Sequence, residues 1–77
     1  MKTTRYFDTV VKVKHSEVRD EWIDQVLTSP LRHEAQPDGR IRFWCRIVEN
    51  GNRALRVVTL ADGETVHNAF FDRGFKG

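Results

Sequence analysis

The sequence has little cysteine and no long apolar run. Cys45 is the only cysteine among 77 residues, so no disulfide can form within the chain, and a reducing compartment is favoured. Every apolar run is too short to cross a bilayer. The N-terminal stretch MKTTRYFDTVVKVK also lacks the continuous apolar segment of a secretory signal. We therefore expect a cytoplasmic protein that does not interact with a membrane.

Charge of one sign is not in strong excess either. The chain has 13 Lys and Arg against 11 Asp and Glu, and so small a surplus does not by itself indicate a nucleic-acid partner. Nine of the 13 basic residues are arginine, whose planar guanidinium suits phosphate groups and base edges better than an ammonium group does. The short length and the 39% hydrophobic share predict a single folded domain over residues 1–77, with a thin core.

The stretch SEVRDEWIDQVLTSP predicts a helix. Ser16 is a suitable N-cap, and the acidic residues that follow it favour the positive end of the helix dipole. Trp22 and Val26 belong to an apolar stripe with four-residue spacing. Pro30 lacks the amide that would continue the helix, so the helix ends before it. Residues 4–14 fit a helix or a strand equally well.

Three turn signals, QPDGR, ENGNR and ADGET, divide the rest of the chain into strands. The four predicted strands are Leu31–Gln36, Arg40–Glu49, Arg53–Ala61 and Glu64–Phe71. Consecutive hairpins give an antiparallel meander, and the helix must cover one of its faces. The predicted fold class is therefore α+β, with an N-terminal part of one or two helices packed on a four-stranded antiparallel β-meander.

The middle hairpin decides which side chains face the helix, because a shift of one residue reverses every direction. A two-residue turn at Asn50–Gly51 places Arg56 opposite Cys45, on the core face. A three-residue loop that includes Asn52 places Arg56 opposite Arg46, on the other face, and asparagine tolerates the left-handed backbone that such a loop needs. Burial of an unpaired arginine is costly, so the longer loop is favoured.

This register predicts two faces of different chemistry. The core face consists of Ile41, Phe43, Cys45, Ile47, Leu55, Val57, Val66 and Phe70. The opposite face consists of Arg42, Trp44, Arg46, Arg56 and His67. The Pro-Asp-Gly loop also pairs Glu34 with Arg42, and the Asp62–Gly63 turn places His67 opposite Val58.

Arginines around an exposed tryptophan are typical of a surface for single-stranded RNA, since guanidinium groups hold phosphates and the indole stacks on a base. His67 could act as the acid or base of metal-independent RNA cleavage, with nearby cations stabilising the transition state. The plainer interpretation is a solvated sheet face, on which Arg42 pairs with Glu34 and Trp44 is covered by arginine stems or by a second subunit.

The order of a helix and then an antiparallel meander resembles the RelE and BrnT ribonuclease toxins of bacterial toxin–antitoxin systems. The stretches QPDGRIRFW and VHNAFFDRGFK resemble a small uncharacterised bacterial family placed near those toxins. The resemblance implies that Arg56 and Arg73 stabilise phosphate and the transition state, that His67 is a general acid or base, and that a small antitoxin-like protein is a partner. The acidic helix departs from the toxins, and Phe75 lies near the place of their terminal tyrosine.

Other features have simpler interpretations. The three histidines lack zinc spacing and the chain has no pair of thiolates, so neither a metal nor another cofactor is expected. Cys45 alternates with core residues and is interpreted as a small buried hydrophobe. In FFDRGFKG, Phe70 is expected to pack inward and Phe71 to shield the other face, while Phe75 anchors the tail. An apolar strip of Trp44, Val58, Leu60 and Phe71 would favour a homodimer.

The leading hypothesis is an RNA-directed, toxin-like domain, with metal-independent endoribonuclease activity as its candidate chemistry. The candidate catalytic residues are Arg56, His67 and Arg73. The candidate nucleic-acid-binding residues are Arg42, Trp44, Arg46 and Lys76. The alternative is a non-catalytic binding or assembly module, whose open sheet face meets a protein partner or a second copy of the chain.

Overall fold

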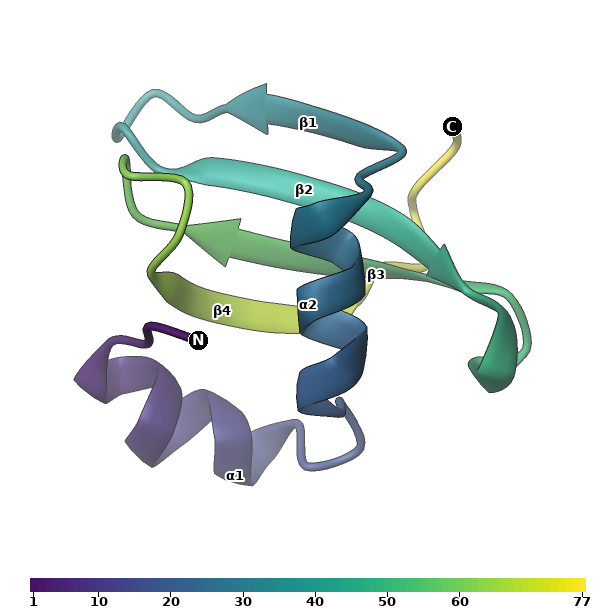
Figure 1. Ribbon diagram of the computed structural model, residues 1–77, viewed down its shortest axis with the longest axis horizontal. Coiled ribbons are helices and arrows are strands. Elements are labelled where there is room, and N and C mark those ends of the chain that lie inside the picture. Colours follow the sequence, from purple (N-terminus) through teal and green to yellow (C-terminus); the bar gives the residue numbers. More distant parts are fainter.

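Four strands form an antiparallel meander in the computed structural model, which describes residues 1–77 (Figure 1). The strands are β1 (Arg32–Ala35), β2 (Ile41–Ile47), β3 (Arg53–Thr59) and β4 (Val66–Phe71), and they lie side by side in this order. Each lies within the range predicted for it. The predicted α+β class, with helices followed by a four-stranded meander, is confirmed.

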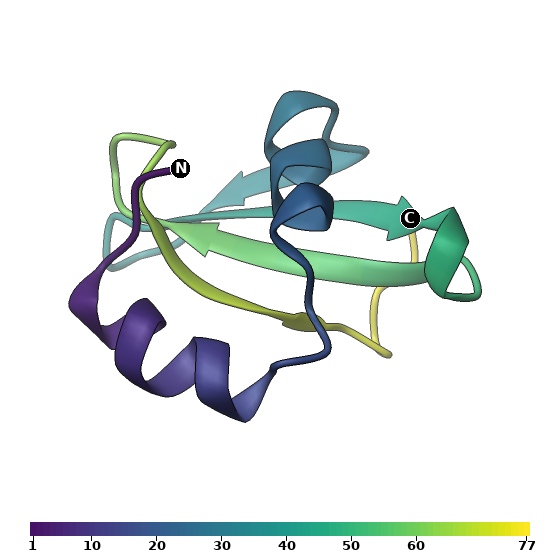
Figure 2. The ribbon, with the colours of Figure 1, turned by 60° about the horizontal axis from the view of Figure 1, so that its bottom comes forward.

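The N-terminal segment, which fits a helix or a strand by pattern, is helical. A π-helical turn, η1 (Phe7–Val11), continues into α1 (Lys12–Lys14). Ahead of it, the amide of Thr4 donates to the carbonyl of Val66 at 3.0 Å, which ties this end of the chain to β4. The helix consequently lies along β4, where Figures 1 and 2 both show it.

Helix α2 (Asp20–Thr28) begins later than predicted. Ser16 is not its N-cap, because the residues after α1 are needed for the turn that connects the two helices. The N-cap position belongs to Arg19, whose extended backbone precedes the first helical turn. The helix ends before Pro30, as predicted. It crosses the sheet on one face, and Figure 2 shows it standing above the strands.

The core lies between this face of the sheet and the two helices. Its buried residues are Phe7, Val11, Ile23, Val26, Ile47, Leu55, Val57, Val66 and Ala69. Phe43 and Cys45 pack against the cluster, so the predicted side of β2 faces the core. The sulfur of Cys45 lies 3.8 Å from the side-chain amide of Gln25 on α2, which is consistent with its interpretation as a packing residue.

The middle hairpin has a longer loop than either predicted register. Residues 48–52 connect the strands, through a short turn η2 (Val48–Asn50) and two residues with positive φ. Arg56 therefore lies opposite Trp44, so the predicted pairing with Arg46 is wrong. The additional two residues leave the alternation of side chains unchanged. The predicted direction of Arg56, away from the core, is confirmed.

A β-bulge in β4 reverses the directions predicted for two phenylalanines. Asn68, rather than His67, lies opposite Val58, because the register shifts by one residue at this point. Every later side chain of the strand then points to the other face. Phe71 packs against the core and Phe70 faces away from it, the opposite of the prediction. Nothing in the ADGET turn signals an extra residue of this kind.

Candidate functional site

The sheet face opposite α2 is covered by the end of the chain, which passes behind the sheet in Figure 1. Trp44 lies under this tail and is only 6% exposed. The ring of Phe75 stacks on the indole, with centroids 5.3 Å apart and planes 18° apart. The expectation of an exposed indole is therefore wrong. The expectation that Phe75 anchors the tail is confirmed.

A tight turn at Asp72 folds the tail back across the sheet. The amide of Asp72 donates to the carbonyl of Ala54 at 2.8 Å, which continues the pairing with β3 by one residue. Its Oδ1 accepts the amide of Gly74 at 2.9 Å, as aspartate commonly does in turns. Its Oδ2 accepts the indole N–H of Trp44 at 2.9 Å. One carboxylate thus fixes both the turn and the tryptophan.

Three guanidinium groups surround the Trp44 ring. Those of Arg32, Arg42 and Arg56 lie 5.8, 5.6 and 5.5 Å from the ring centroid. Glu34 pairs with Arg32 and, at 3.0 Å, with Arg42, so the pairing of Glu34 with Arg42 is confirmed. The hydrogen bond from Arg32 lowers the pKa of Glu34, which keeps this carboxylate ionised.

Arg56 is held from three sides. Its guanidinium lies 5.5 Å from the Trp44 centroid and 5.3 Å from the Phe70 centroid. Its Nη1 is 3.8 Å from Oδ2 of Asp72. The Nε of Arg56 and that of Arg42 are buried without a hydrogen-bond partner. A buried donor without an acceptor costs the fold free energy.

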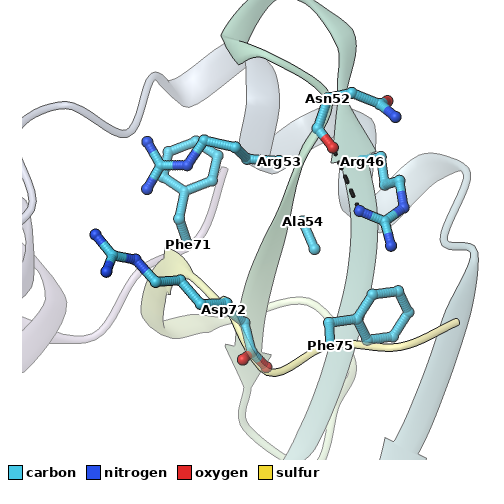
Figure 3. A pocket seen from close by; sticks show the side chains of 8 residues that line it. Arg46, Asn52, Arg53, Ala54, Phe71, Asp72 and Phe75 are labelled. Atoms are coloured by element: carbon cyan, nitrogen blue, oxygen red, sulfur yellow. Dashed lines mark hydrogen bonds between the residues drawn. The ribbon is translucent and has the colours of Figure 1, made fainter.

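A small pocket opens beside the tail at the start of β3 (Figure 3). It has a volume of about 270 Å³ and is lined by Arg46, Asn52, Arg53, Ala54, Phe71, Asp72, Arg73 and Phe75. Figure 3 shows Arg53 beside the ring of Phe71 and Arg46 near Phe75, with Ala54 between these two pairs. We call it the first pocket.

A second pocket, of about 290 Å³, shares two of these residues, Asp72 and Phe75. It is lined by Arg32, Glu34, Arg42, Trp44, Asp72, Gly74, Phe75 and Lys76. The two pockets therefore adjoin the same part of the tail. We call the two pockets, together with Arg56 beside Trp44, the arginine face. Its cations are Arg32, Arg42, Arg46, Arg53, Arg56, Arg73 and Lys76.

His67 belongs to a different part of the molecule. Its Nδ1 lies 3.0 Å from the hydroxyl of Thr4, and its ring stacks on Tyr6 with centroids 4.9 Å apart. Burial lowers the pKa of His67, and the charge of Arg40 acts in the same direction. Both of its partners come from the N-terminal segment. The structure does not bring the predicted acid or base into contact with the predicted catalytic arginines.

Sequence reasoning missed two cations of the arginine face, Arg32 and Arg53, and the counter-ion Asp72. Arg32 enters because β1 pairs it with Trp44, and Arg53 enters through the five-residue loop of the middle hairpin. Asp72 contacts Trp44 and Arg56 only because the tail folds back across the sheet, which strand pairing does not predict. The DRG turn was a signal for that reversal, but pairing patterns do not extend beyond the last strand.

The predicted dimer strip is not an exposed surface. Trp44 and Val58 are each 6% exposed, and Phe71 faces the core. The large apolar side chains that are exposed lie elsewhere, for example Val13 on α1 and Val48 in the loop between β2 and β3. An apolar strip on this face therefore gives no support to a homodimer.

No group of three His, Cys, Asp or Glu side chains lies close enough together to hold a metal ion. Neither helix has the length and apolar content that a membrane-spanning helix requires. No protein-family model matches this chain, and no curated protein or solved structure is significantly similar to it. The resemblance to RelE and BrnT toxins therefore stays a prediction.

Proposed function

We propose that this domain binds single-stranded RNA through the arginine face, without cleaving it. The observation that carries the proposal is the excess of cations around the two pockets. Five arginines and Lys76 line the two pockets and Arg56 lies beside Trp44, whereas Glu34 and Asp72 are the only acids among the lining residues. Phosphate groups are the ligands that such a surface favours, and guanidinium planes also offer stacking positions to unpaired bases.

Aromatic rings hold several of these guanidinium groups in place. Arg53 lies 4.6 Å from the centroid of Phe71, and Arg46 lies 5.6 Å from that of Phe75. A guanidinium stacked on a ring keeps the N–H groups at its rim free for an acceptor. Such groups have lost part of their freedom before the ligand arrives, which lowers the entropic cost of binding.

Binding without cleavage agrees with the position of His67. General acid–base catalysis needs a group within hydrogen-bond reach of the reacting oxygen, and cations at the same phosphate. The Nδ1 of His67 is engaged with Thr4, and its ring with Tyr6. No histidine or cysteine is among the side chains that line the two pockets of the arginine face.

The proposal predicts mainly phosphate contacts and therefore little sequence preference. The ring of Phe75 stacks on the indole of Trp44, so an RNA base cannot stack there while the tail is in place. The affinity for single-stranded RNA should fall steeply with salt, since each phosphate contact adds about −0.7 to the slope of log K against log salt concentration.

The test is fluorescence anisotropy with a labelled single-stranded RNA over a series of salt concentrations. We expect Arg46→Gln to weaken binding about tenfold, as the loss of one charge-assisted hydrogen bond requires. Arg19→Gln is the matched control, because Arg19 lies at the start of α2, on the other face of the sheet. It should change the affinity less than about twofold.

Three outcomes would contradict the proposal. No binding even at low salt would exclude the RNA ligand, and binding that is insensitive to salt would favour a protein partner instead. Equal losses for Arg46→Gln and Arg19→Gln would exclude the arginine face as the site. Gel analysis of the same samples checks the second part of the proposal, which requires the RNA to keep its full length.

A further inference from the structure

We propose that the first pocket binds a terminal phosphate group, the phosphate monoester at one end of an RNA strand. This inference rests on the proposed function, because it assigns one position on the arginine face to one part of the ligand. The charges of the lining residues, the contacts that hold them and the size of the pocket all support it.

None of the three arginines of this pocket has a carboxylate partner within 4.0 Å. Arg19, Arg32, Arg40, Arg42 and Arg56 each lie within 4.0 Å of an acidic side chain. Arg46, Arg53 and Arg73 have no such partner, although all three line one pocket. The remaining arginine, Arg5, is exposed on the N-terminal segment.

Asp72 also lines the pocket but is engaged with other groups. Its two oxygens accept hydrogen bonds from Gly74 and Trp44, and the nearest guanidinium is that of Arg56 outside the pocket. Three arginines and one aspartate leave a formal charge of +2 at the pocket. A phosphate monoester carries about −1.5 to −2 near neutral pH, whereas a diester in the middle of a strand carries only one charge. The charge of the pocket therefore favours the terminal phosphate of an RNA strand over a phosphate in its middle.

Two of the three guanidinium groups are held in advance. Arg53 rests on Phe71, and Arg46 rests on Phe75 while its Nη1 donates to the carbonyl of Asn52 at 3.3 Å. The other N–H groups of both side chains stay free for acceptors. Arginine binds phosphate oxygens through paired N–H groups, and three such groups around one site suit the three terminal oxygens of a monoester.

The size of the pocket follows from a small residue at its base. Ala54 is 5% exposed and lies between the two aromatic-supported arginines in Figure 3. The resulting volume of about 270 Å³ is below the range of about 300 to 1,000 Å³ that is usual for sites of drug-sized ligands. A small anion, or the end group of a longer ligand, fits this space. The second pocket shares Asp72 and Phe75 with the first, so the next nucleotides of the RNA would lie there.

The test compares RNAs of one sequence that differ only at their ends: a 5′-phosphate, a 3′-phosphate, or hydroxyl groups at both ends. We expect one of the phosphorylated RNAs to bind about tenfold more tightly than the hydroxyl form, the gain of one or two charge-assisted hydrogen bonds. The preferred end gives the direction of the strand. Arg53→Gln and Arg73→Gln should each remove most of this preference, and Arg19→Gln should retain it.

Ala54→Leu provides a variant that keeps every charge. Its side chain fills the base of the pocket, so the preference for a terminal phosphate should disappear while the hydroxyl RNA still binds. Thermal melting confirms that each variant is folded, and Ala54→Val is the smaller replacement if leucine does not fit. Equal affinities of wild type for all three RNAs would overturn the phosphate pocket and leave the proposed function intact.

A second measurement is independent of RNA. Titration with inorganic phosphate, followed by NMR of the arginine Nε–H signals, should give saturable shifts for Arg46, Arg53 and Arg73 but not for Arg19. No shift at these three residues would overturn the pocket assignment. Saturable shifts without any RNA binding would support the anion pocket and remove the proposed function.

Discussion

The indole N–H of Trp44 donates to the carboxylate of Asp72, 28 residues further along the chain, at 2.9 Å. The same oxygen of Asp72 lies 3.8 Å from the guanidinium of Arg56. This relationship joins the tail to the sheet, and it places the negative charge of the tail among the arginines. The stability of the fold and the charge of the arginine face therefore depend on one side chain.

Replacement of this aspartate should be costly. Asp72→Ala leaves the Trp44 N–H and the half-buried guanidinium of Arg56 without an acceptor, so we expect the free energy of unfolding to fall by about 2 kcal/mol. Asp72→Asn retains one acceptor oxygen and should cost less. Urea denaturation measures both. Asp24→Ala, on the exposed side of α2, is the control and should stay within about 0.5 kcal/mol of wild type.

A loss for Asp72→Ala no larger than that for Asp24→Ala would show that the tail does not hold the sheet in solution. In that case the stacking of Phe75 on Trp44 would also lack support. The two replacements remove the same charge from the same chain, so a general effect of net charge cannot produce the difference.

Phe75→Ala should expose the plane of Trp44. The stacked pair contributes about 0.5 to 1.5 kcal/mol beyond the burial of area, so the variant should lose roughly this amount of stability or more. Acrylamide should quench the fluorescence of Trp44 more strongly than in wild type. Both proteins carry Trp22→Phe in this experiment, so that Trp44 is the only emitter. Lys76→Ala, an exposed neighbour in the tail, should leave the quenching unchanged.

The fold was accessible from sequence because turn residues and alternation repeat along the second half of the chain. The direction of Arg56 was also accessible, since the cost of burying a lone arginine under α2 argues against the two-residue turn that would place it there. The length of that loop was not. The loop consists of the short turn Val48–Asn50 and two left-handed residues, Gly51 and Asn52. Its length is known only from the observed pairing of Arg56 with Trp44.

The candidate site was predicted in part. Arg42, Arg56 and Trp44 share a face because they alternate on paired strands. Alternation fails at the bulge in β4, which moves Phe70 to the arginine face and gives His67 a place beside Thr4. The tail is a tertiary contact without a periodic pattern, so the burial of Trp44 could not be read from spacing.

His67 should give the protein a pH-dependent stability near neutrality. Its pKa is lowered from the usual 6.5, mainly by burial. The unfolded chain therefore binds a proton at a higher pH than the folded chain does, so stability is lost as the pH falls from about 7 towards the lowered pKa. Thermal melting at pH 7.5 and pH 5.5 measures this loss. The two carboxylates with lowered pKa values do not interfere with this comparison. The pKa of Asp62 is about 2, and the pKa of Glu34 is lowered below its usual 4.5.

The matched variant for this experiment is His67→Asn, which can retain the hydrogen bond with Thr4 but does not titrate. We expect its melting temperature to change less between the two pH values than that of wild type. His15 and His33 remain in both proteins, so their contributions cancel in the comparison. An identical pH dependence in the two proteins would exclude His67 as the group responsible.

The backbone at Asn52 is the physical reason that the middle hairpin has its register. Its φ is 59°, in the left-handed region, and it follows Gly51 with a φ of 67°. Asn52→Val introduces a β-branched side chain into this region and should cost about 1 to 2 kcal/mol, whereas Asn52→Gly should be close to neutral. Glu49→Val places the same side chain at an exposed position of the same loop and should change stability by less than about 0.5 kcal/mol. If urea denaturation gave equal values for the two valine variants, Asn52 would not be left-handed, and the pairing that directs Arg56 to the arginine face would lose its support.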